Sequence, residues 1–252
     1  MNGPDTYVFC DGQLLVRAGT LEPATAAEAV PAGSTARQVL DSFTVRPQGF
    51  GAMAVSGSPG EAPAGCEWIR LRTLIAAESP CSADASRALG LLNWRESHRF
   101  CGVCGHPLGE HPVEMARMCA HCGHVDYPGI SPAVIVRVEK EGRILLARHV
   151  ERIPDFYSCL AGYVEAGESA EEGVRREIHE EAGIEVRDIR YAGSQYWPYP
   201  SQLMLAFTAK WASGELRLQA EELVDAQWFD PTHLPAVPPP GSVAHRLIHE
   251  WN

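Results

Sequence analysis

The 252-residue sequence predicts an α/β protein in which two smaller parts precede the main domain. Residues 1–98 alternate short apolar runs with Gly- and Pro-rich stretches and one helical pattern, which is typical of a small α+β domain. Residues 99–127 contain two closely spaced cysteine pairs, which indicates a metal-binding segment. Residues 128–252 place one acidic amphipathic helix among β-rich runs, and this pattern predicts an α/β domain.

The first part carries local signals for a hairpin, a further strand and a helix. The apolar runs Tyr7–Cys10 and Gln13–Arg17 are separated only by Asp11-Gly12, and this dipeptide favours the tight turn of a β-hairpin. We expect another strand over Trp68–Ile75, because the run is rich in apolar residues. Ser82 is expected to begin a helix that ends at about His98.

Composition and charge exclude several classes of protein. No apolar run reaches the length of about 18 residues that a membrane-spanning helix needs. The first residues lack the basic and apolar segments of a signal peptide, so we expect a cytoplasmic protein. The net charge of −11 disfavours general affinity for nucleic acid. A substrate that carries phosphate would need a divalent cation to offset this charge.

Two Cys-x-x-Cys pairs lie 14 residues apart and comprise Cys101, Cys104, Cys119 and Cys122. Tight turns would point all four sulfurs at one tetrahedral Zn²⁺. Such a site is closed, so its role would be structural, although two redox pairs or four incidental thiols are alternatives. A segment of this kind can also bind nucleic acid or a partner. Four sulfurs satisfy zinc, so we do not expect the nearby histidines to be ligands; these are His106, His121 and His124.

The acidic helix has clear start and stop signals. Ser169 and Glu172 form a capping box, and Gly183 suits the C-terminal cap, so the helix should span Ala170–Ala182. Its apolar stripe comprises Ala170, Val174, Ile178 and Ala182.

Three carboxylates share a face of this helix beside the apolar stripe: Glu177, Glu180 and Glu181. One interpretation is a solvated surface with Glu–Arg pairs. The other is a site for Mg²⁺ or Mn²⁺, whose preferred ligands are carboxylate oxygens. Glu181 lies at the edge of the apolar stripe, which favours a buried position.

The stretch resembles the Nudix box, G-x5-E-x7-R-E-U-x-E-E-x-G-U with U aliphatic. The matching residues are Gly162, Glu168, Arg176, Glu177, Ile178, Glu180, Glu181, Gly183 and Ile184. Resemblance to Nudix hydrolases implies an α/β/α sandwich with a mixed sheet and metal-dependent cleavage of a nucleoside diphosphate linked to another group. It also implies that the three glutamates bind the metals and that Arg176 orients them. Among the three, Glu181 is our candidate proton acceptor, because its position at the stripe edge favours a buried site.

A second stretch, Ser194–Gln202, resembles the S-Q-P-W-P-F-P-x-S array of the NADH pyrophosphatase branch of that family. Its prolines make a stiff loop whose aromatic rings can stack on a base. A strand edge whose aromatics pack in the core is the alternative. The cysteine segment, which resembles the branch's zinc ribbon, and the tail Pro238–Ala244 share this resemblance. Three residues depart from the array, namely Tyr196, Tyr199 and Gln202.

The resemblance implies further site residues. Ala161, through its carbonyl, and Glu222 would complete the metal ligands, with Glu221 as the alternative to Glu222. Tyr163 would stack on the nicotinamide. The other expected substrate-binding residues are Arg72, Glu114, Tyr127, Gln195, Tyr196, Trp197, Pro198, Tyr199, Pro200, Ser201, Gln202 and Ala244.

The activity that this branch implies is hydrolysis of NAD(H) to AMP and nicotinamide mononucleotide by a homodimer with one structural zinc per chain. Removal of NAD caps from RNA 5′ ends breaks the same bond. One alternative is a Nudix hydrolase for another nucleoside diphosphate derivative, such as ADP-ribose. The other is an inactive zinc-ribbon protein that binds RNA or serves as a scaffold.

Overall fold

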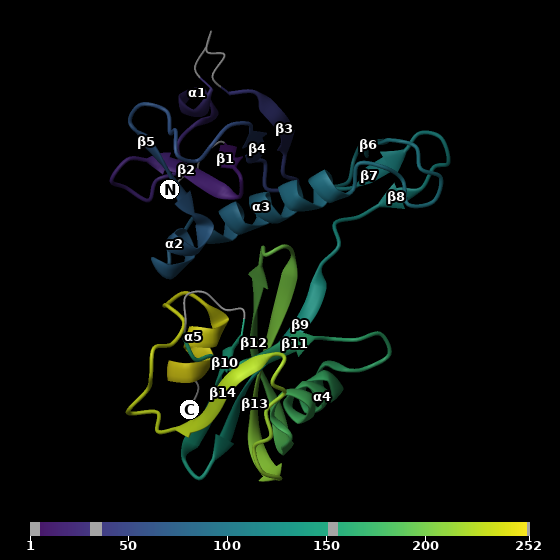
Figure 1. The fold of residues 1–252 in the computed structure, drawn as a ribbon. Helices are drawn as coiled ribbons and strands as arrows, with labels where there is room; N and C mark the ends of the chain where they lie inside the picture. Colours follow the sequence, from purple (N-terminus) through teal and green to yellow (C-terminus); the bar gives the residue numbers. More distant parts are fainter. Residues whose placement is uncertain (1–5, 31–36, 151–155, 251–252) are drawn as a thin grey trace. The chain divides into compact units, whose positions relative to one another are not determined.

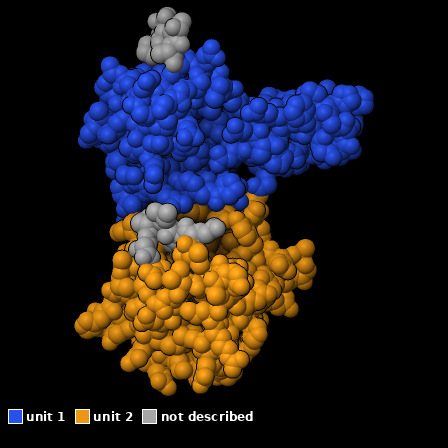
Figure 2. Space-filling view, in the orientation of Figure 1, with its two compact units in different colours: residues 1–129, 198–201 blue, residues 130–197, 202–252 orange. Residues whose placement is uncertain are grey.

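A computed structural model describes residues 6–30, 37–150 and 156–250. The chain forms two compact units, which Figure 2 colours separately. Unit 1 comprises residues 1–129 and 198–201, and unit 2 comprises residues 130–197 and 202–252. None of the helices in the described ranges combines the length and the apolar content needed to cross a membrane. The domain borders expected after residues 98 and 127 stay predictions.

Unit 1 begins with a five-stranded mixed sheet in the order β3-β4-β1-β2-β5. The predicted hairpin is present, since β1 and β2 are antiparallel and both Asp11 and Gly12 have the positive φ angles of a tight hairpin turn, 48° and 70°. The strands are β1 (Thr6–Cys10), β2 (Gln13–Arg17), β3 (Val39–Thr44), β4 (Gly51–Val55) and β5 (Cys66–Arg70).

The helices of unit 1 correct one expectation. The strand predicted over Trp68–Ile75 ends at Arg70, and the following residues form a helix. Leu71, Leu74 and Ile75 are buried at the i, i+3, i+4 spacing of a helix, so packing overrides the strand-like composition. The expected long helix is present. The helices are α1 (Ala26–Ala29), α2 (Leu71–Ala76) and α3 (Ser82–Ser97).

A small three-stranded antiparallel sheet follows α3 and carries the cysteine pairs (Figure 1). Its strands, in the order β6-β7-β8, are β6 (Leu108–Glu110), β7 (Arg117–Cys119) and β8 (Val125–Asp126).

Unit 2 is built on a six-stranded mixed sheet in the order β12-β13-β9-β10-β14, with β11 paired to β9. Only the β9–β13 pair is parallel among the strand pairs described in this sheet. The strands are β9 (Ser131–Lys140), β10 (Arg143–His149), β11 (Leu160–Tyr163), β12 (Glu185–Trp197), β13 (Gln202–Ser213) and β14 (Leu223–Phe229).

One helix covers each face of this sheet, α4 (Ala170–Ala182) and α5 (Val243–His249) (Figure 1). Alternate residues of β9 point to opposite faces. Val134 and Val136 therefore pack in the cluster that contains α4, whereas Ile135 packs in the cluster that contains α5. The expected α/β/α sandwich with a mixed sheet is confirmed.

The acidic helix α4 has the predicted limits. The capping box of Ser169 and Glu172 is present, and Gly183 ends the helix with φ 69° in the left-handed region that favours glycine. The last helix, α5, begins after Ser242, whose hydroxyl accepts a hydrogen bond from the N–H of His245.

Candidate metal sites and substrate-binding residues

The two cysteine knuckles have the same backbone structure. In each, the first cysteine accepts a hydrogen bond from the glycine four residues later at 2.9 Å. These glycines, Gly105 and Gly123, have φ angles of 74° and 75°, which residues with a side chain rarely adopt. The repeated geometry turns both sulfurs of each pair inward.

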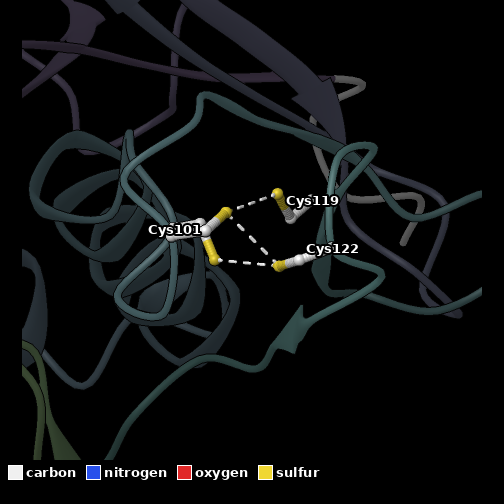
Figure 3. A group of neighbouring side chains, drawn as sticks. Cys101, Cys119 and Cys122 are labelled. Carbon is white, nitrogen blue, oxygen red and sulfur yellow. Dashed lines mark hydrogen bonds between the residues drawn. The ribbon is translucent and has the colours of Figure 1, made fainter.

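The four cysteine sulfurs converge on one point (Figure 3). The sulfur of Cys122 lies 3.7 Å from that of Cys101 and 3.4 Å from that of Cys104, and Cys104 lies 3.5 Å from Cys119. A tetrahedral zinc with bonds of about 2.3 Å separates its sulfur ligands by about 3.8 Å. The residues therefore fit zinc, and the segment holds a four-cysteine zinc site.

Two histidines lie beside this site. The rings of His106 and His121 are stacked with centroids 3.8 Å apart and planes only 5° apart. Their nitrogens and the sulfur of Cys104 lie within 4.8 Å of one another. Parallel rings place their nitrogens side by side, whereas the four sulfurs surround one centre, so the sulfurs are the better-arranged ligand set for zinc. That the histidines are not ligands stays a prediction.

Arg176 on α4 is the hub of the Nudix-box residues. Its Nε and Nη2 donate to both oxygens of Glu168, at 3.1 and 2.7 Å. Its Nη1 donates to Glu177 at 2.9 Å and to Glu180 at 3.0 Å, and Nη2 also donates to the carbonyl of Tyr163 at 2.8 Å. The hydrogen bond from Arg176 is the main reason that the pKa of Glu168 is lowered to about 2. Glu168 thus stays ionised and fixes the guanidinium.

Glu177 lies directly against the backbone of β11. A Cβ atom at Gly162 would be 1.9 Å from the carboxylate carbon of Glu177, so any side chain there would displace this carboxylate. Burial raises the pKa of Glu177, hydrogen bonding to Arg176 opposes this, and the charges of Glu180 and Glu222 raise it further. A cation held between these carboxylates would relieve the repulsion.

Glu181 occupies the buried position that its place beside the apolar stripe favours. Only 2% of the residue is exposed, and its backbone carbonyl accepts from the N–H of Gln219 at 3.1 Å. A buried carboxylate is costly unless hydrogen bonds or a cation compensate it. This donor set, with its hard oxygens and excess negative charge, suits a divalent metal ion.

The carboxylates of the four expected metal ligands do not converge as closely as the cysteine sulfurs. These ligands are Glu177, Glu180, Glu181 and Glu222. Within the described part of the chain, the only groups with three potential ligand atoms within 4.8 Å of one another are those at the cysteine site. Arg176 accounts for part of this wider spacing of the carboxylates, because its guanidinium pairs with Glu177 and Glu180.

The two residues expected to complete the metal site come from two different segments of unit 2. Glu222 comes directly before β14, where its carbonyl accepts from the N–H of Val150 at 2.9 Å. Its charge contributes to the raised pKa of Glu177. Ala161 lies on β11 directly before Gly162.

Three of the expected substrate-binding residues, Tyr163, Gln195 and Gln202, make side-chain hydrogen bonds in unit 2. The amide of Gln202 donates to the hydroxyl of Tyr163 at 2.5 Å, and the Tyr163 residue is 50% exposed. The amide of Gln195 donates to the carbonyl of Gly241 at 2.8 Å and accepts from the N–H of Val243 at 2.6 Å. Gln195 therefore fixes the start of α5, where Ala244 packs in the core.

Residues 198–201, between β12 and β13, belong to unit 1. Asn93 of α3 donates to the carbonyls of Pro198 and Pro200, both at 3.3 Å. The guanidinium of Arg72 lies 4.6 Å from the centre of the Tyr199 ring. Ser201 donates to the carbonyl of Gly129 at 2.8 Å.

The aromatic residues of this array are neither fully buried nor fully exposed. Tyr196 and Trp197 end β12 and are half-buried, as is Tyr199. Burial raises the pKa of Tyr199. The array is therefore intermediate between the two alternatives, an open stacking loop and a core-packed strand edge.

Glu114 and Tyr127 meet in unit 1. The hydroxyl of Tyr127 donates to the carboxylate of Glu114, and this hydrogen bond raises the pKa of Tyr127. The Tyr127 residue is 57% exposed, so its ring is accessible at the surface of this unit.

Sequence reasoning missed two residues that organise these sites. Glu168 stands eight residues before Arg176 in the motif, and that spacing could have suggested the ion pair. No local signal could have identified Asn93, because its partners lie more than 100 residues further along the chain.

Two family models match the chain. The NUDIX domain matches residues 129–251, and the NADH pyrophosphatase zinc ribbon domain matches residues 96–127.

Curated relatives and solved structures also resemble the chain. It is 46% identical over 166 residues to the NAD-capped RNA hydrolase NudC of Salmonella heidelberg, a match that covers 66% of this chain and 65% of the relative. It is 44% identical over 180 residues to the protein of the same name from Salmonella typhimurium, covering 71% and 70%. A crystal structure of a NUDIX hydrolase from Nitrosomonas europaea matches 52% of this chain and 77% of its own at 25% identity, with a TM-score of 0.46.

Proposed function

Because the chain belongs to the Nudix hydrolases and carries an NADH pyrophosphatase zinc ribbon, we propose that it hydrolyses the pyrophosphate bond of NAD(H) to AMP and nicotinamide mononucleotide. The carboxylates around Arg176, whose guanidinium also binds the backbone carbonyl of the half-exposed Tyr163, are the observation that carries this proposal. The relatives' name refers to NAD-capped RNA, and an NAD cap contains the same bond. Cleavage of NAD caps is therefore part of the proposal.

The two proposed kinds of metal differ in role. The zinc, one per chain, is structural because four sulfurs leave no open position. Mg²⁺ or Mn²⁺ is the proposed catalytic ion, and its ligands would be the carbonyl of Ala161 and the carboxylates of Glu177, Glu180, Glu181 and Glu222. Such an ion supplies charge stabilisation for the pyrophosphate oxygens and acidifies a bound water.

The protein's own residues position the reacting groups. Arg176 orients Glu177 and Glu180, and Glu168 holds Arg176 in place. The water oxygen bonds to one phosphorus as the bond from that phosphorus to the bridging oxygen breaks. Glu181, which is buried beside the apolar stripe, is the proposed acceptor of the water proton. The bridging oxygen leaves with the second mononucleotide.

Other residues are proposed to bind the substrate. Tyr163 would stack on the nicotinamide ring through its exposed face. The remaining proposed contacts are Arg72, Glu114, Tyr127, Gln195, Tyr196, Trp197, Pro198, Tyr199, Pro200, Ser201, Gln202 and Ala244. A homodimer and a cytoplasmic location complete the proposal.

Product analysis tests the proposal. The purified protein is incubated with NADH, NAD⁺, ADP-ribose or NAD-capped RNA, with Mg²⁺ or Mn²⁺ and with a chelator. We expect AMP and nicotinamide mononucleotide from NADH or NAD⁺ only when the divalent ion is present. Cleavage of ADP-ribose alone would favour the alternative substrate class. Absence of any cleavage by a folded, zinc-loaded protein would favour the binding-protein alternative.

Glu181→Gln tests the proton acceptor. The variant keeps the size of the side chain, so we expect turnover to fall by at least about 100-fold while zinc content and thermal unfolding stay near wild type. Glu171→Gln is the matched control, because Glu171 is exposed in the first turn of the same helix. A metal-dependent, fully active Glu181→Gln variant would disprove the assignment.

A further inference from the structure

We propose that Gln202 is a positioning residue that holds the Tyr163 ring as a stacking platform, and that this pair favours dinucleotides over substrates without a second base. The inference rests on the proposed function. It differs from the sequence expectation, in which Gln202 would itself line the substrate pocket, because here Gln202 acts through Tyr163.

The backbone of β11 places Tyr163 directly after Gly162, the residue that contacts Glu177. Neighbouring residues of a strand point to opposite faces. Gly162 faces α4, where it contacts Glu177, so Tyr163 faces the opposite side with Ala161, which packs in the cluster of α5. The carbonyl of Tyr163 is also fixed by Arg176 at 2.8 Å. The backbone of Tyr163 is therefore anchored to the carboxylate cluster, while its ring lies on the other face of the sheet.

The strand register brings Gln202 to the same face. Tyr163 of β11 pairs with Ala133 of β9, and Ala133 pairs with Met204 of β13. Gln202 lies two residues before Met204 and shares its face of the sheet. Two strand spacings amount to about 10 Å, which long side chains must bridge. The serine of the family array would be too short to reach the hydroxyl of Tyr163.

The hydrogen bond gives an exposed ring a defined orientation. The Tyr163 residue is 50% exposed, and its hydroxyl accepts a hydrogen bond of 2.5 Å from the side-chain amide of Gln202. Without it, the ring would be free to adopt other rotamers, and binding would have to restrict them. A ring held in place before binding stacks on a planar base at lower entropic cost.

The test measures binding and turnover in parallel. Gln202→Ala, Gln202→Ser, Tyr163→Phe and the double variant Gln202→Ala/Tyr163→Phe are compared, with Gln227→Ala as control for an exposed glutamine on another strand. NADH and ADP-ribose are the two ligands, because ADP-ribose lacks the nicotinamide. NADH binding is measured by fluorescence in the Glu181→Gln background, where turnover does not interfere.

We expect each single variant to raise KM and Kd for NADH about 3- to 10-fold, the size that one lost neutral hydrogen bond produces, with kcat changed less than twofold. The double variant should be no worse than either single variant, because both remove the same bond. Binding of ADP-ribose should change less than twofold, and Gln202→Ser should match Gln202→Ala.

Three results would overturn the inference. The first is an additive increase of the Kd for NADH in the double variant. The second is an unchanged Kd in Tyr163→Phe when Gln202→Ala raises it. The third is a loss of ADP-ribose binding as large as the loss of NADH binding. If the wild type binds NADH but does not cleave it, and the variants weaken binding as expected, the proposed function fails while the role of Gln202 stands. If cleavage occurs and the variants bind NADH normally, the inference fails alone.

Discussion

The cysteine site of unit 1 and the carboxylate cluster of unit 2 hold their ligands in opposite ways. Three pairs of cysteine sulfurs lie only 3.4–3.7 Å apart, namely Cys101–Cys122, Cys104–Cys119 and Cys104–Cys122. The glutamates are kept apart, and Arg176 pairs with two of them. A gathered, closed set of ligands suits a metal that stabilises a fold. The carboxylates held in place by the guanidinium of Arg176 do not form a closed set. They stay available for a metal ion that must also bind oxygen atoms of the substrate.

The two regions also differ in what stabilises them without metal. The apolar cluster of the cysteine segment consists of Leu108 and three of the cysteines themselves. Helix α4 packs instead into a large core that includes Val174, Ile178 and Ala182. The cysteine segment should therefore depend on zinc for folding, whereas α4 should stay folded when the catalytic ion is removed.

Removal of zinc is the largest expected effect. Cys119→Ser deletes a fully buried ligand, and structural zinc sites contribute about 10–16 kcal/mol of apparent binding free energy. We expect loss of bound zinc and rapid proteolysis within residues 99–127. Zinc content and limited proteolysis measure this. Cys81→Ser, outside the site, is the control. A zinc-free Cys119→Ser protein that resists proteolysis as the wild type does would contradict the comparison.

Gly162→Ala should have the next largest effect, and it should act on chemistry more than on folding. The new Cβ would lie 1.9 Å from the carboxylate carbon of Glu177, so this carboxylate must move. We expect kcat to fall by at least about 100-fold and stability by about 1–3 kcal/mol. Kinetics and thermal unfolding measure the two effects.

The matched control for Gly162→Ala is Gly109→Ala, where the nearest atom to an added Cβ is 3.8 Å away. It should leave activity and zinc binding near wild type. Normal kcat in Gly162→Ala would mean that the position of Glu177 is not critical, and the contrast between the two metal regions would lose its basis.

Local sequence patterns predicted the parts of both regions that depend on neighbouring residues. The capping box of Ser169 and the glycine cap at Gly183 set the limits of α4, and both are in place. The spacing of the cysteines predicted a site whose sulfurs do converge. These features need only contacts across one helix or between two short turns.

Contacts between distant segments could not be predicted from patterns. The Gln202–Tyr163 bond depends on the register of β11, β9 and β13, which no local signal determines. The helix from Leu71 was missed because its apolar residues also suit a strand.

Asn93→Ala should have the smallest effect, and it asks whether unit 1 contributes to substrate binding besides holding zinc. The variant removes two hydrogen bonds of 3.3 Å to residues 198–201. These bonds are long and partly exposed, so their loss should cost about 1 kcal/mol or less. We expect KM for NADH to rise about 2- to 5-fold with kcat unchanged, because residues 198–201 would be held less firmly.

Ser97→Ala, one turn further along α3, is the control for this variant, since the hydroxyl of Ser97 bonds carbonyls of its own helix and the adjacent His98. It should leave KM unchanged. If Asn93→Ala lowers the melting temperature but not the affinity for NADH, α3 only supports the fold of unit 1. A raised KM at an unchanged melting temperature would instead assign unit 1 a part in substrate binding that is separate from its zinc site.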